Sequence, residues 1–310
     1  MTEPANAPSA VARDPAPGLM SAWRDLPRLR TGRPGTTAYM RARGEAAAAG
    51  ARWTEITGLS PHALCAIVGA EDPAFFQHRG IWWGPLVRRT ASAVLRGERV
   101  AGVSTINQQL ARNLYLHAGR TAARKLGEML LARRMERVLG KARILELYVN
   151  VVEWGPGTWG VQDAAERYFG CTADRLDAFH AVVLASLLPA PRAPLAGKNL
   201  ERALGTQRRL LHFLYAAGVM TLTEWRQTGE RLALLAAALR AGRDAGPVLR
   251  ELGNRIDQVR PAATPDATAL LRSHCGLRLR AAYTALLDGE AHPSTWMGRL
   301  PHRWTGRVGA

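Results

Sequence analysis

Residues 71–80 contain the side chains best suited to acid–base chemistry. The segment begins with the carboxylate pair Glu71 and Asp72 and continues with two phenylalanines, a histidine and a glycine. Ser60 followed by proline predicts a helix start, and the residues after it predict a helix whose apolar side also carries Glu71. A carboxylate there is partly desolvated and lies at the negative end of the helix dipole, and both effects raise its pKa. Glu71 is therefore a candidate general base, although a surface Glu–Asp pair at a helix end has the same pattern.

A second polar segment runs over residues 102–114 with the sequence GVSTINQQLARNL. Thr105 and Gln108 have capping-box spacing, which predicts a loop that enters a helix with free backbone N–H groups, a common anion site. Ser104, Gln108 and Arg112 are spaced by four and share a helix face. A hydroxyl, an amide and a guanidinium in a row suit a phosphorylated ligand. An ordinary capped surface helix is the alternative.

Three further blocks follow. Arg124 lies one helical turn before Glu128, which predicts a second functional carboxylate flanked by a cation. An ordinary solvated ion pair is the alternative interpretation. Residues 141–150 mix charged and apolar side chains at helical spacing. A glycine-rich loop at 153–160 then enters a helix of small residues.

The five blocks, in this order and spacing, resemble the peptidoglycan glycosyltransferases of glycosyltransferase family 51, and most closely the monofunctional biosynthetic transglycosylases. The resemblance covers about residues 37–215 and implies a mainly α, lysozyme-like helical glycosyltransferase domain with head and jaw lobes. Beyond residue 215 the sequence has neither likeness to the family nor the Ser-x-x-Lys motif of a fused penicillin-binding domain. The blocks are residues 71–80, 102–114, 124–128, 141–150 and 155–170.

The resemblance implies a reaction in which lipid II is polymerised into β-1,4 glycan strands. The 4-hydroxyl of the acceptor attacks the anomeric carbon of the donor, undecaprenyl pyrophosphate leaves, and the configuration inverts, by analogy with inverting glycosidases. Glu71 corresponds to the family's general base. Glu128 corresponds to its second catalytic glutamate, beside the donor pyrophosphate. No cofactor is required, but Glu128 could hold a divalent metal, Mg²⁺ or Mn²⁺, together with substrate phosphate.

The resemblance places the substrate contacts on polar and cationic side chains of the second, third and fourth blocks. Guanidinium groups bind phosphate oxygens bidentately and stay charged, which suits a pyrophosphate. The predicted substrate-binding residues are Ser104, Thr105, Gln108, Gln109, Arg112, Asn113, Arg124, Lys125 and Lys141.

Other residues of the first block are expected to be structural. Phe75, Phe76 and His78 are predicted to pack around the base. Asp72 is predicted to bind local backbone or cations and to orient Glu71. The sequence departs from the family at Arg112, where lysine is usual, which keeps the charge but changes its shape.

The chain has 310 residues and a net charge of +17, carried mostly by arginine. Such a charge favours anionic partners, but the arginines are spread along the chain, so charge alone does not select among lipid headgroups, pyrophosphates and nucleic acid. Genomic composition bias explains the charge outside the blocks equally well. With the resemblance, the expected partners are lipid II, the growing glycan chain, the membrane surface and cell-wall synthesis proteins, and nucleic acid is not expected.

The family resemblance places the protein at the external, periplasmic face of the cytoplasmic membrane, yet the sequence shows no transmembrane helix or signal peptide. Residues 178–191 form the longest uncharged run, which is too short to span a bilayer and is predicted to be a buried helix. Trp82, Trp83 and the leucines after them alternate with arginines, which predicts an interfacial helix in the family's jaw. A helix packed on the domain is the alternative.

The predicted organisation is a disordered tail at residues 1–36, a peptidoglycan glycosyltransferase domain at 37–215 and a helical C-terminal extension of unknown role at 216–310. Within the extension, helices are expected at 223–240 and 248–259. Two other functions remain open: a glycan-cleaving, lysozyme-like enzyme with Glu71 as its acid, and a non-catalytic basic protein that binds membranes or nucleic acid on the same scaffold.

Overall fold

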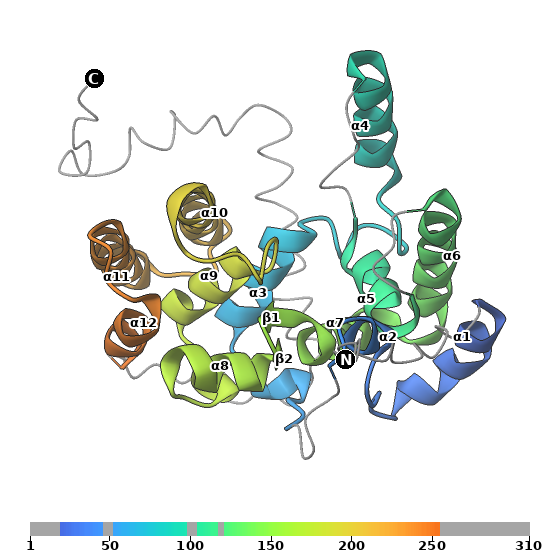
Figure 1. The fold of residues 1–310 in the computed structure, drawn as a ribbon, viewed down its shortest axis with the longest axis horizontal. Coiled ribbons are helices and arrows are strands. Elements are labelled where there is room, and N and C mark those ends of the chain that lie inside the picture. Colours follow the sequence, from blue (N-terminus) through green and yellow to red (C-terminus); the bar gives the residue numbers. More distant parts are fainter. Residues whose placement is uncertain (1–18, 46–51, 98–103, 117–120, 255–310) are drawn as a thin grey trace, which may run out of the picture.

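The computed structural model describes residues 19–45, 52–97, 104–116 and 121–254. These ranges are mainly helical, with one short β-hairpin, so the predicted mainly α fold is confirmed (Figure 1). The helices before the hairpin are α1 (Leu19–Asp25), α2 (Ala38–Ala42), α3 (Pro61–Glu71), α4 (Trp83–Arg96), α5 (Ile106–Tyr115), α6 (Ala122–Val138) and α7 (Gly140–Val151). The later elements are β1 (Glu153–Gly155), β2 (Thr158–Trp159), α8 (Val161–Phe169), α9 (Ala178–Leu187), α10 (Gly197–Ala216), α11 (Leu222–Arg240) and α12 (Ala245–Gly253). Short 3-10 helices are η1 (Leu26–Arg30), η2 (Ile56–Gly58) and η3 (Ala173–Arg175).

Helices α3 and α9 pack against each other in the core. Helix α3 begins as predicted, because the side chain of Ser60 accepts a hydrogen bond from the backbone N–H of Ala63 at 3.2 Å. All residues of α9 are buried, so the buried helix predicted for the apolar run at 178–191 is confirmed over residues 178–187. The last four residues of the run lie beyond the helix end, and Pro189 is exposed. Within the described ranges, no helix combines the length and the apolar character that crossing a membrane requires.

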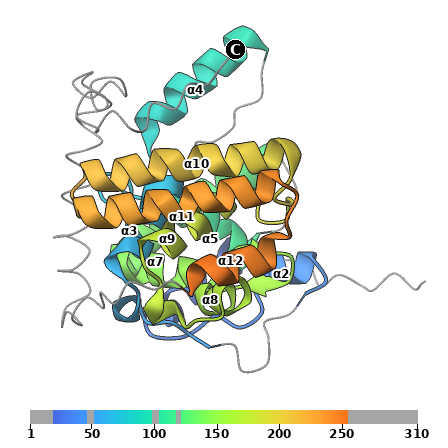
Figure 2. The ribbon, with the colours of Figure 1, turned by 90° about the vertical axis from the view of Figure 1, so that its left-hand side faces the viewer.

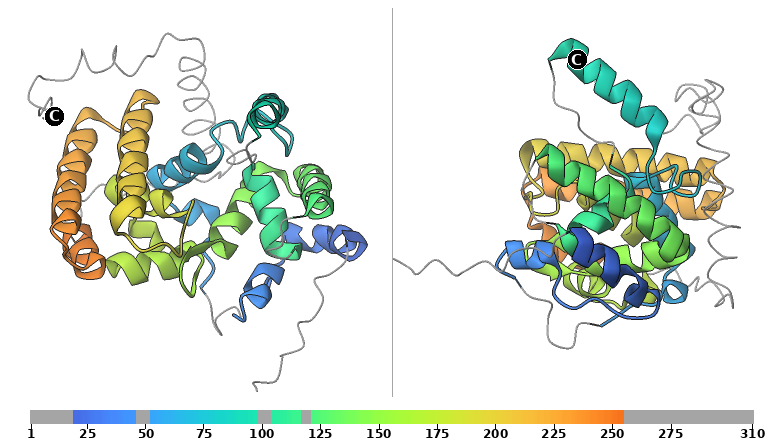
Figure 3. Two further views of the ribbon diagram at one scale, coloured as in Figure 1. Left: turned by 45° about the horizontal axis from the view of Figure 1, so that its top comes forward. Right: turned by 90° about the vertical axis from the view of Figure 1, so that its right-hand side faces the viewer.

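Helix α5 lies against α6 and α7 (Figure 3) and starts with the predicted capping box, in which Thr105 and Gln108 bind each other's backbone N–H groups. Gly80 fixes the neighbouring turn against α6. Its φ is +89°, and a Cβ there would lie 2.6 Å from the carbonyl oxygen of Ala132, so only glycine fits.

Two polar residues of α7 hold the segment that leads into α3. Asn150 exchanges two hydrogen bonds with the backbone of Thr54, both 2.9 Å long. Glu146 accepts a bond from the backbone N–H of Ile56 at 3.1 Å. The fourth block therefore anchors the chain before α3 as well as filling the core.

Helices α10, α11 and α12 cover the side of the molecule opposite α1 and α6, and α10 and α11 lie side by side (Figures 1 and 2). The helix predicted at 223–240 is confirmed as α11. The helix predicted at 248–259 begins earlier, at Ala245, because Asp244 caps it, and it ends at Gly253. The rest of the predicted extension lies outside the described residues.

A buried arginine fastens these helices to the core. The Arg231 guanidinium donates hydrogen bonds to the carbonyl oxygen of Leu252, at 2.7 and 3.1 Å, and to Asp177 Oδ2 at 2.5 Å. Asp177 in turn caps α9. Residues up to 253 are therefore packed on the core rather than separate from it.

The expectation of a disordered tail through residue 36 is wrong for its second half. Residues 19–30 form α1 and η1, in which Ala22 and Leu26 are fully buried and pack with the main core. The apolar residues of this segment recur at spacings of three and four and form one stripe. The stabilisation gained by burying this stripe outweighs the tendency to disorder that was inferred from the proline and arginine content.

Helix α4 projects away from the rest of the molecule (Figures 1 and 2). Trp83, Val87 and Leu95 are 50%, 61% and 86% exposed. Large apolar side chains on a projecting helix leave a surface that other molecules can contact.

Candidate active site

Glu71 is the last residue of α3, and burial raises its pKa above the ordinary value, as predicted. Its Oε2 accepts a hydrogen bond from Gln109 Nε2 at 2.7 Å. Gln109 is held in turn by Tyr148 of α7, whose hydroxyl donates to Gln109 Oε1 at 3.0 Å. Within the described ranges, Glu71 Oε1 is buried without a hydrogen-bond partner. The carboxylate is thus oriented through one oxygen and has the other available to accept a proton.

Asp72 points to a different set of partners. Its Oδ2 accepts from the backbone N–H of Ile106 at 3.0 Å and lies 2.9 Å from His78 Nε2. Because His78 Nδ1 accepts from the Gly80 backbone N–H at 3.1 Å, Nε2 carries the proton and donates to Asp72. Asp72 joins the end of α3 to the start of α5, which sets Glu71 opposite Gln109. The backbone contact predicted for Asp72 is thereby confirmed, and its role in orienting Glu71 stays a prediction.

Glu128 of α6 is only 3% exposed and is flanked by two cations. Arg124 Nη1 contacts one carboxylate oxygen, and Lys125 Nζ lies 2.9 Å from the other. Lys125 Nζ also donates to Ser104 Oγ at 2.9 Å, so the second and third blocks meet here. Burial, together with the nearby positive charges of Arg124 and Arg112, lowers the pKa of Lys125 to about 8.

Arg112 connects the two carboxylate regions electrostatically. Its positive charge opposes the upward shift that burial gives the pKa of Glu71, and it also disfavours a charged Lys125. In the described part of the chain, Arg112 has no salt bridge, and its guanidinium carbon lies 5.7 Å from the ring centroid of Tyr39. The sequence did not identify Tyr39 or the orienting role of Tyr148. Tyr148 lies within the fourth block, but Tyr39 precedes all five blocks.

The remaining predicted residues of the second block have structural contacts. Thr105 is buried and donates from Oγ1 to the carbonyl oxygen of Gly80 at 2.7 Å. Gln108 accepts from the Thr105 backbone N–H at 3.0 Å, and Asn113 Nδ2 donates to the carbonyl oxygen of Gln109 at 3.1 Å. These contacts build α5, and contact of these side chains with substrate stays a prediction.

Lys141 lies beside a carboxylate other than Glu128. Its Nζ is 2.8 Å from Glu136 Oε2 and 4.3 Å from the ring centroid of Phe75. Glu136 is two turns beyond Glu128 on α6, a rise of about 12 Å. The structure thus brings Lys125 and Arg124, but not Lys141, to Glu128, and substrate binding by Lys141 stays a prediction.

The residues around Glu128 do not fit a protein-held divalent metal. Both of its oxygens already face cations, which would repel a metal ion. In the part of the chain that the structure describes, no three His, Cys, Asp or Glu side chains gather as metal ligands would.

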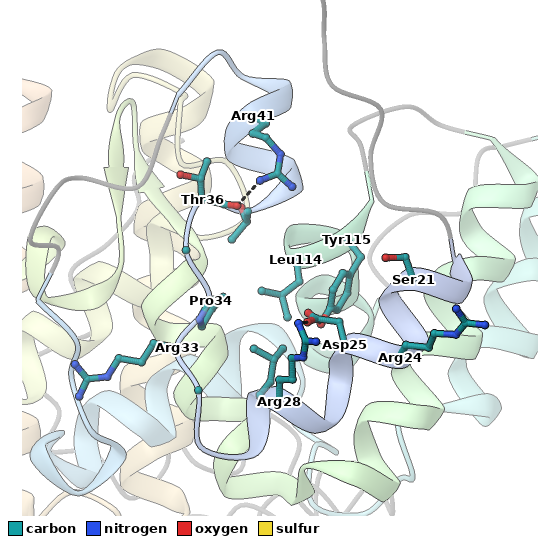
Figure 4. A pocket seen from close by; sticks show the side chains of 14 residues that line it. Ser21, Arg24, Asp25, Arg28, Arg33, Pro34, Thr36, Arg41, Leu114 and Tyr115 are labelled. Carbon is teal, nitrogen blue, oxygen red and sulfur yellow. Dashed lines mark hydrogen bonds and ion pairs between the residues drawn. The ribbon is translucent and has the colours of Figure 1, made fainter.

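A cavity of about 590 Å³ lies elsewhere, between α1, η1, the segment 31–37 and the end of α5 (Figure 4). Its lining residues include Arg24, Arg28, Arg33 and Arg41 and none of the residues predicted for the site. In Figure 4, Arg24 and Arg33 extend in different directions, so the guanidinium groups do not converge on one point.

The helical fold carries one buried carboxylate oriented by a hydrogen bond and a second carboxylate flanked by two cations, an arrangement typical of an enzyme. Residues 40–214, more than half of the chain, match the transglycosylase family, and the chain belongs to that family.

Biosynthetic peptidoglycan transglycosylases are among its relatives. One from Laribacter hongkongensis is 43% identical over 141 residues, which are 46% of this chain and 62% of the relative. One from Nitrosospira multiformis is 37% identical over 193 residues, 60% of this chain and 84% of the relative. One from Nitrosomonas eutropha is 34% identical over 232 residues, 66% of this chain and 95% of the relative. The chain thus covers less than two thirds of the Laribacter relative.

Proposed function

We propose that the protein is a peptidoglycan glycosyltransferase that polymerises lipid II with inversion and releases undecaprenyl pyrophosphate. The observation that carries the proposal is the pairing of Glu71, oriented by Gln109, with Arg112 and the cations around Glu128. Family membership and the names of the relatives support it.

In the proposed reaction, Glu71 takes the proton of the acceptor's 4-hydroxyl as that oxygen bonds to the donor's anomeric carbon. The bond from that carbon to the pyrophosphate breaks, and the pyrophosphate leaves with the electron pair. Arg112, Arg124 and Lys125 offset the charge that develops on it. The raised pKa of Glu71 makes it a stronger base than an ordinary carboxylate.

The alternative of a glycan-cleaving enzyme is less well supported. A hydrolase of neutral glycan has no anionic leaving group, whereas two cations flank Glu128 here.

Incubation of the purified protein with labelled lipid II in detergent, followed by gel separation, distinguishes the functions. Polymer is expected; shortening of pre-made glycan would support the hydrolase, and no reaction with either would support a non-catalytic role.

We also propose that the protein works at the outer face of the cytoplasmic membrane and docks there through α4. Trp83, Val87 and Leu95 are exposed on this projecting helix, and Arg88 and Arg96 are exposed beside them. Basic residues near an anionic surface contribute on the order of 1 kcal/mol each, and salt weakens this attraction.

Sedimentation with anionic liposomes tests the docking. The wild type is expected to bind at low salt and to be partly released at high salt. The triple change Trp83→Ser, Val87→Ser and Leu95→Ser should abolish binding while circular dichroism stays unchanged. Leu222→Ser with Leu234→Ser, which alters exposed leucines of α11, is the matched control. Equal binding by the triple variant and the wild type would exclude α4 as the docking surface.

A further inference from the structure

Tyr39 is presented to the active site by a short helix that is firmly seated. Its neighbours Ala38 and Met40 are buried, and Thr37 caps α2 by accepting a hydrogen bond from the Met40 backbone N–H at 3.2 Å. Helix α2 packs on α5, which carries Arg112. The backbone of Tyr39 is therefore fixed relative to the backbone of Arg112.

The ring of Tyr39 is fixed as well. Its hydroxyl accepts a hydrogen bond from Arg43 Nη2 at 2.7 Å, and the guanidinium of Arg43 lies 5.1 Å from the ring centroid. Trp159 meets the ring edge-on, with centroids 6.1 Å apart and planes at 75°. The indole of Trp159 is itself held by Glu45, to which its Nε1 donates at 2.6 Å. Tyr39 is thus a rigid aromatic surface rather than a free side chain.

We propose that Tyr39 is a positioning residue, whose ring holds the Arg112 guanidinium between the base and the phosphate-binding cations. The proposal rests on the function proposed above. Arg112 lacks a carboxylate partner in the described ranges, so the contact with the ring, 5.7 Å from guanidinium carbon to centroid, takes the place of a salt bridge. A cation–π contact fixes a guanidinium without neutralising it. Arg112 therefore keeps its full charge for a substrate phosphate, whereas a carboxylate partner would offset that charge.

The position of Arg112 affects the protonation of Glu71. The groups that face Glu71 are Gln109 and Arg112 of α5, Asp72 at the end of α3, and Tyr148 of α7. Among them Arg112 carries the positive charge, which favours the ionised carboxylate. A guanidinium released into water is screened, so its effect at Glu71 weakens. Loss of the Tyr39 ring should therefore raise the pKa of Glu71 and move the acidic limb of the rate profile to higher pH.

The test compares Tyr39→Leu, which removes the ring, with Tyr39→Phe, which keeps it. Carboxyl-carbon NMR of protein labelled at glutamate, with the Glu71 signal assigned by Glu71→Gln, gives the pKa without substrate. Tyr39→Leu should raise the pKa of Glu71, as Arg112→Ala should, and lower kcat about tenfold, since misplacement of a catalytic group is costly. Tyr39→Phe should stay within about twofold of wild-type kcat, because the ring remains.

Two controls make the result specific. Tyr215→Leu changes a tyrosine packed against Trp225, away from the site, and should leave the pKa of Glu71 unchanged. Tyr39→Leu added to Arg112→Ala should cause no further shift. If Tyr39→Leu does not fold, Tyr39→Met provides the same comparison.

An unchanged pKa of Glu71 in folded Tyr39→Leu or Tyr39→Met would overturn the proposal. The titration separates this outcome from failure of the proposed function. If the wild type does not polymerise lipid II, the function is wrong, while the NMR measurement still decides whether Tyr39 positions Arg112.

Discussion

The active site and the arginine-lined cavity are both basic, but their charges are arranged differently. In the site, Glu128 is almost fully buried and its cations contact it directly. In the cavity, Arg28 lies 3.9 Å from Asp25 with 86% of its side chain exposed, and the pair of Arg33 and Glu55 is also mostly exposed. Exposed ion pairs contribute about 0–1 kcal/mol, because water screens them.

This difference shows that positive charge by itself does not define a functional site in this protein. The basic residues behind the net charge of +17 are spread along the chain, whereas the site is set apart by burial and by hydrogen bonds that fix its charged groups. Equivalent substitutions in the two regions should therefore have unequal effects on activity.

The largest difference is expected between two glutamates. Glu71→Gln keeps the shape of the base but removes its basicity, so turnover of lipid II should fall by about 10²–10⁴-fold. Glu55→Gln, which alters the exposed partner of Arg33 beside the cavity, should leave turnover within about twofold, since exposed pairs contribute little. The measurement is the initial rate of lipid II polymerisation by each variant and by the wild type. Near wild-type turnover by Glu71→Gln would rule out Glu71 as the base.

A smaller difference is expected between two arginines. Arg124→Ala removes a charge-assisted contact of roughly 1.5–3 kcal/mol, so kcat/KM should fall by about 10- to 100-fold. Arg24→Ala in the cavity removes the same charge from the protein and should have little effect on kcat/KM. Equal losses in the two variants would indicate that general basicity, and not a site, controls activity.

The pH dependence sharpens the comparison further. Activity should rise as Glu71 ionises and fall again as pH rises through about 8, where Lys125 loses its proton. Lys125→Arg should remove the alkaline decline, because arginine stays charged. The decline should reach about tenfold, the lower end of the loss expected for one charge-assisted phosphate contact. A pH–rate profile with the same alkaline limb in both proteins would contradict this assignment.

The smallest effect on activity is expected for Tyr115, which lines the cavity. Its hydroxyl donates to Asp25 Oδ2 at 2.9 Å, and Tyr115→Phe removes that bond. The free energy of unfolding should fall by about 1 kcal/mol, as measured by urea denaturation. Turnover should remain at the wild-type level, and a large loss of turnover would connect the cavity to the reaction.

The features predicted well from sequence depend on neighbouring residues. The caps at Ser60 and Thr105 and the helix α11 follow from side chains within one turn of the backbone groups they satisfy. The raised pKa of Glu71 was predicted in the same way, from its place on the apolar side at a helix end. The ordered α1 was missed, because its stability comes from burial against distant helices.

The sequence by itself determined the family, the mainly α fold and the positions of both carboxylates, because these depend on residue types and short spacings. Only the tertiary structure decided which side chains meet. Gln109 binds Glu71 from 38 residues away, Lys125 binds Ser104 from 21 residues away, and Tyr39 reaches Arg112 from another helix. Contacts of this kind depend on how helices pack against one another, and packing is set by the whole core rather than by any local pattern.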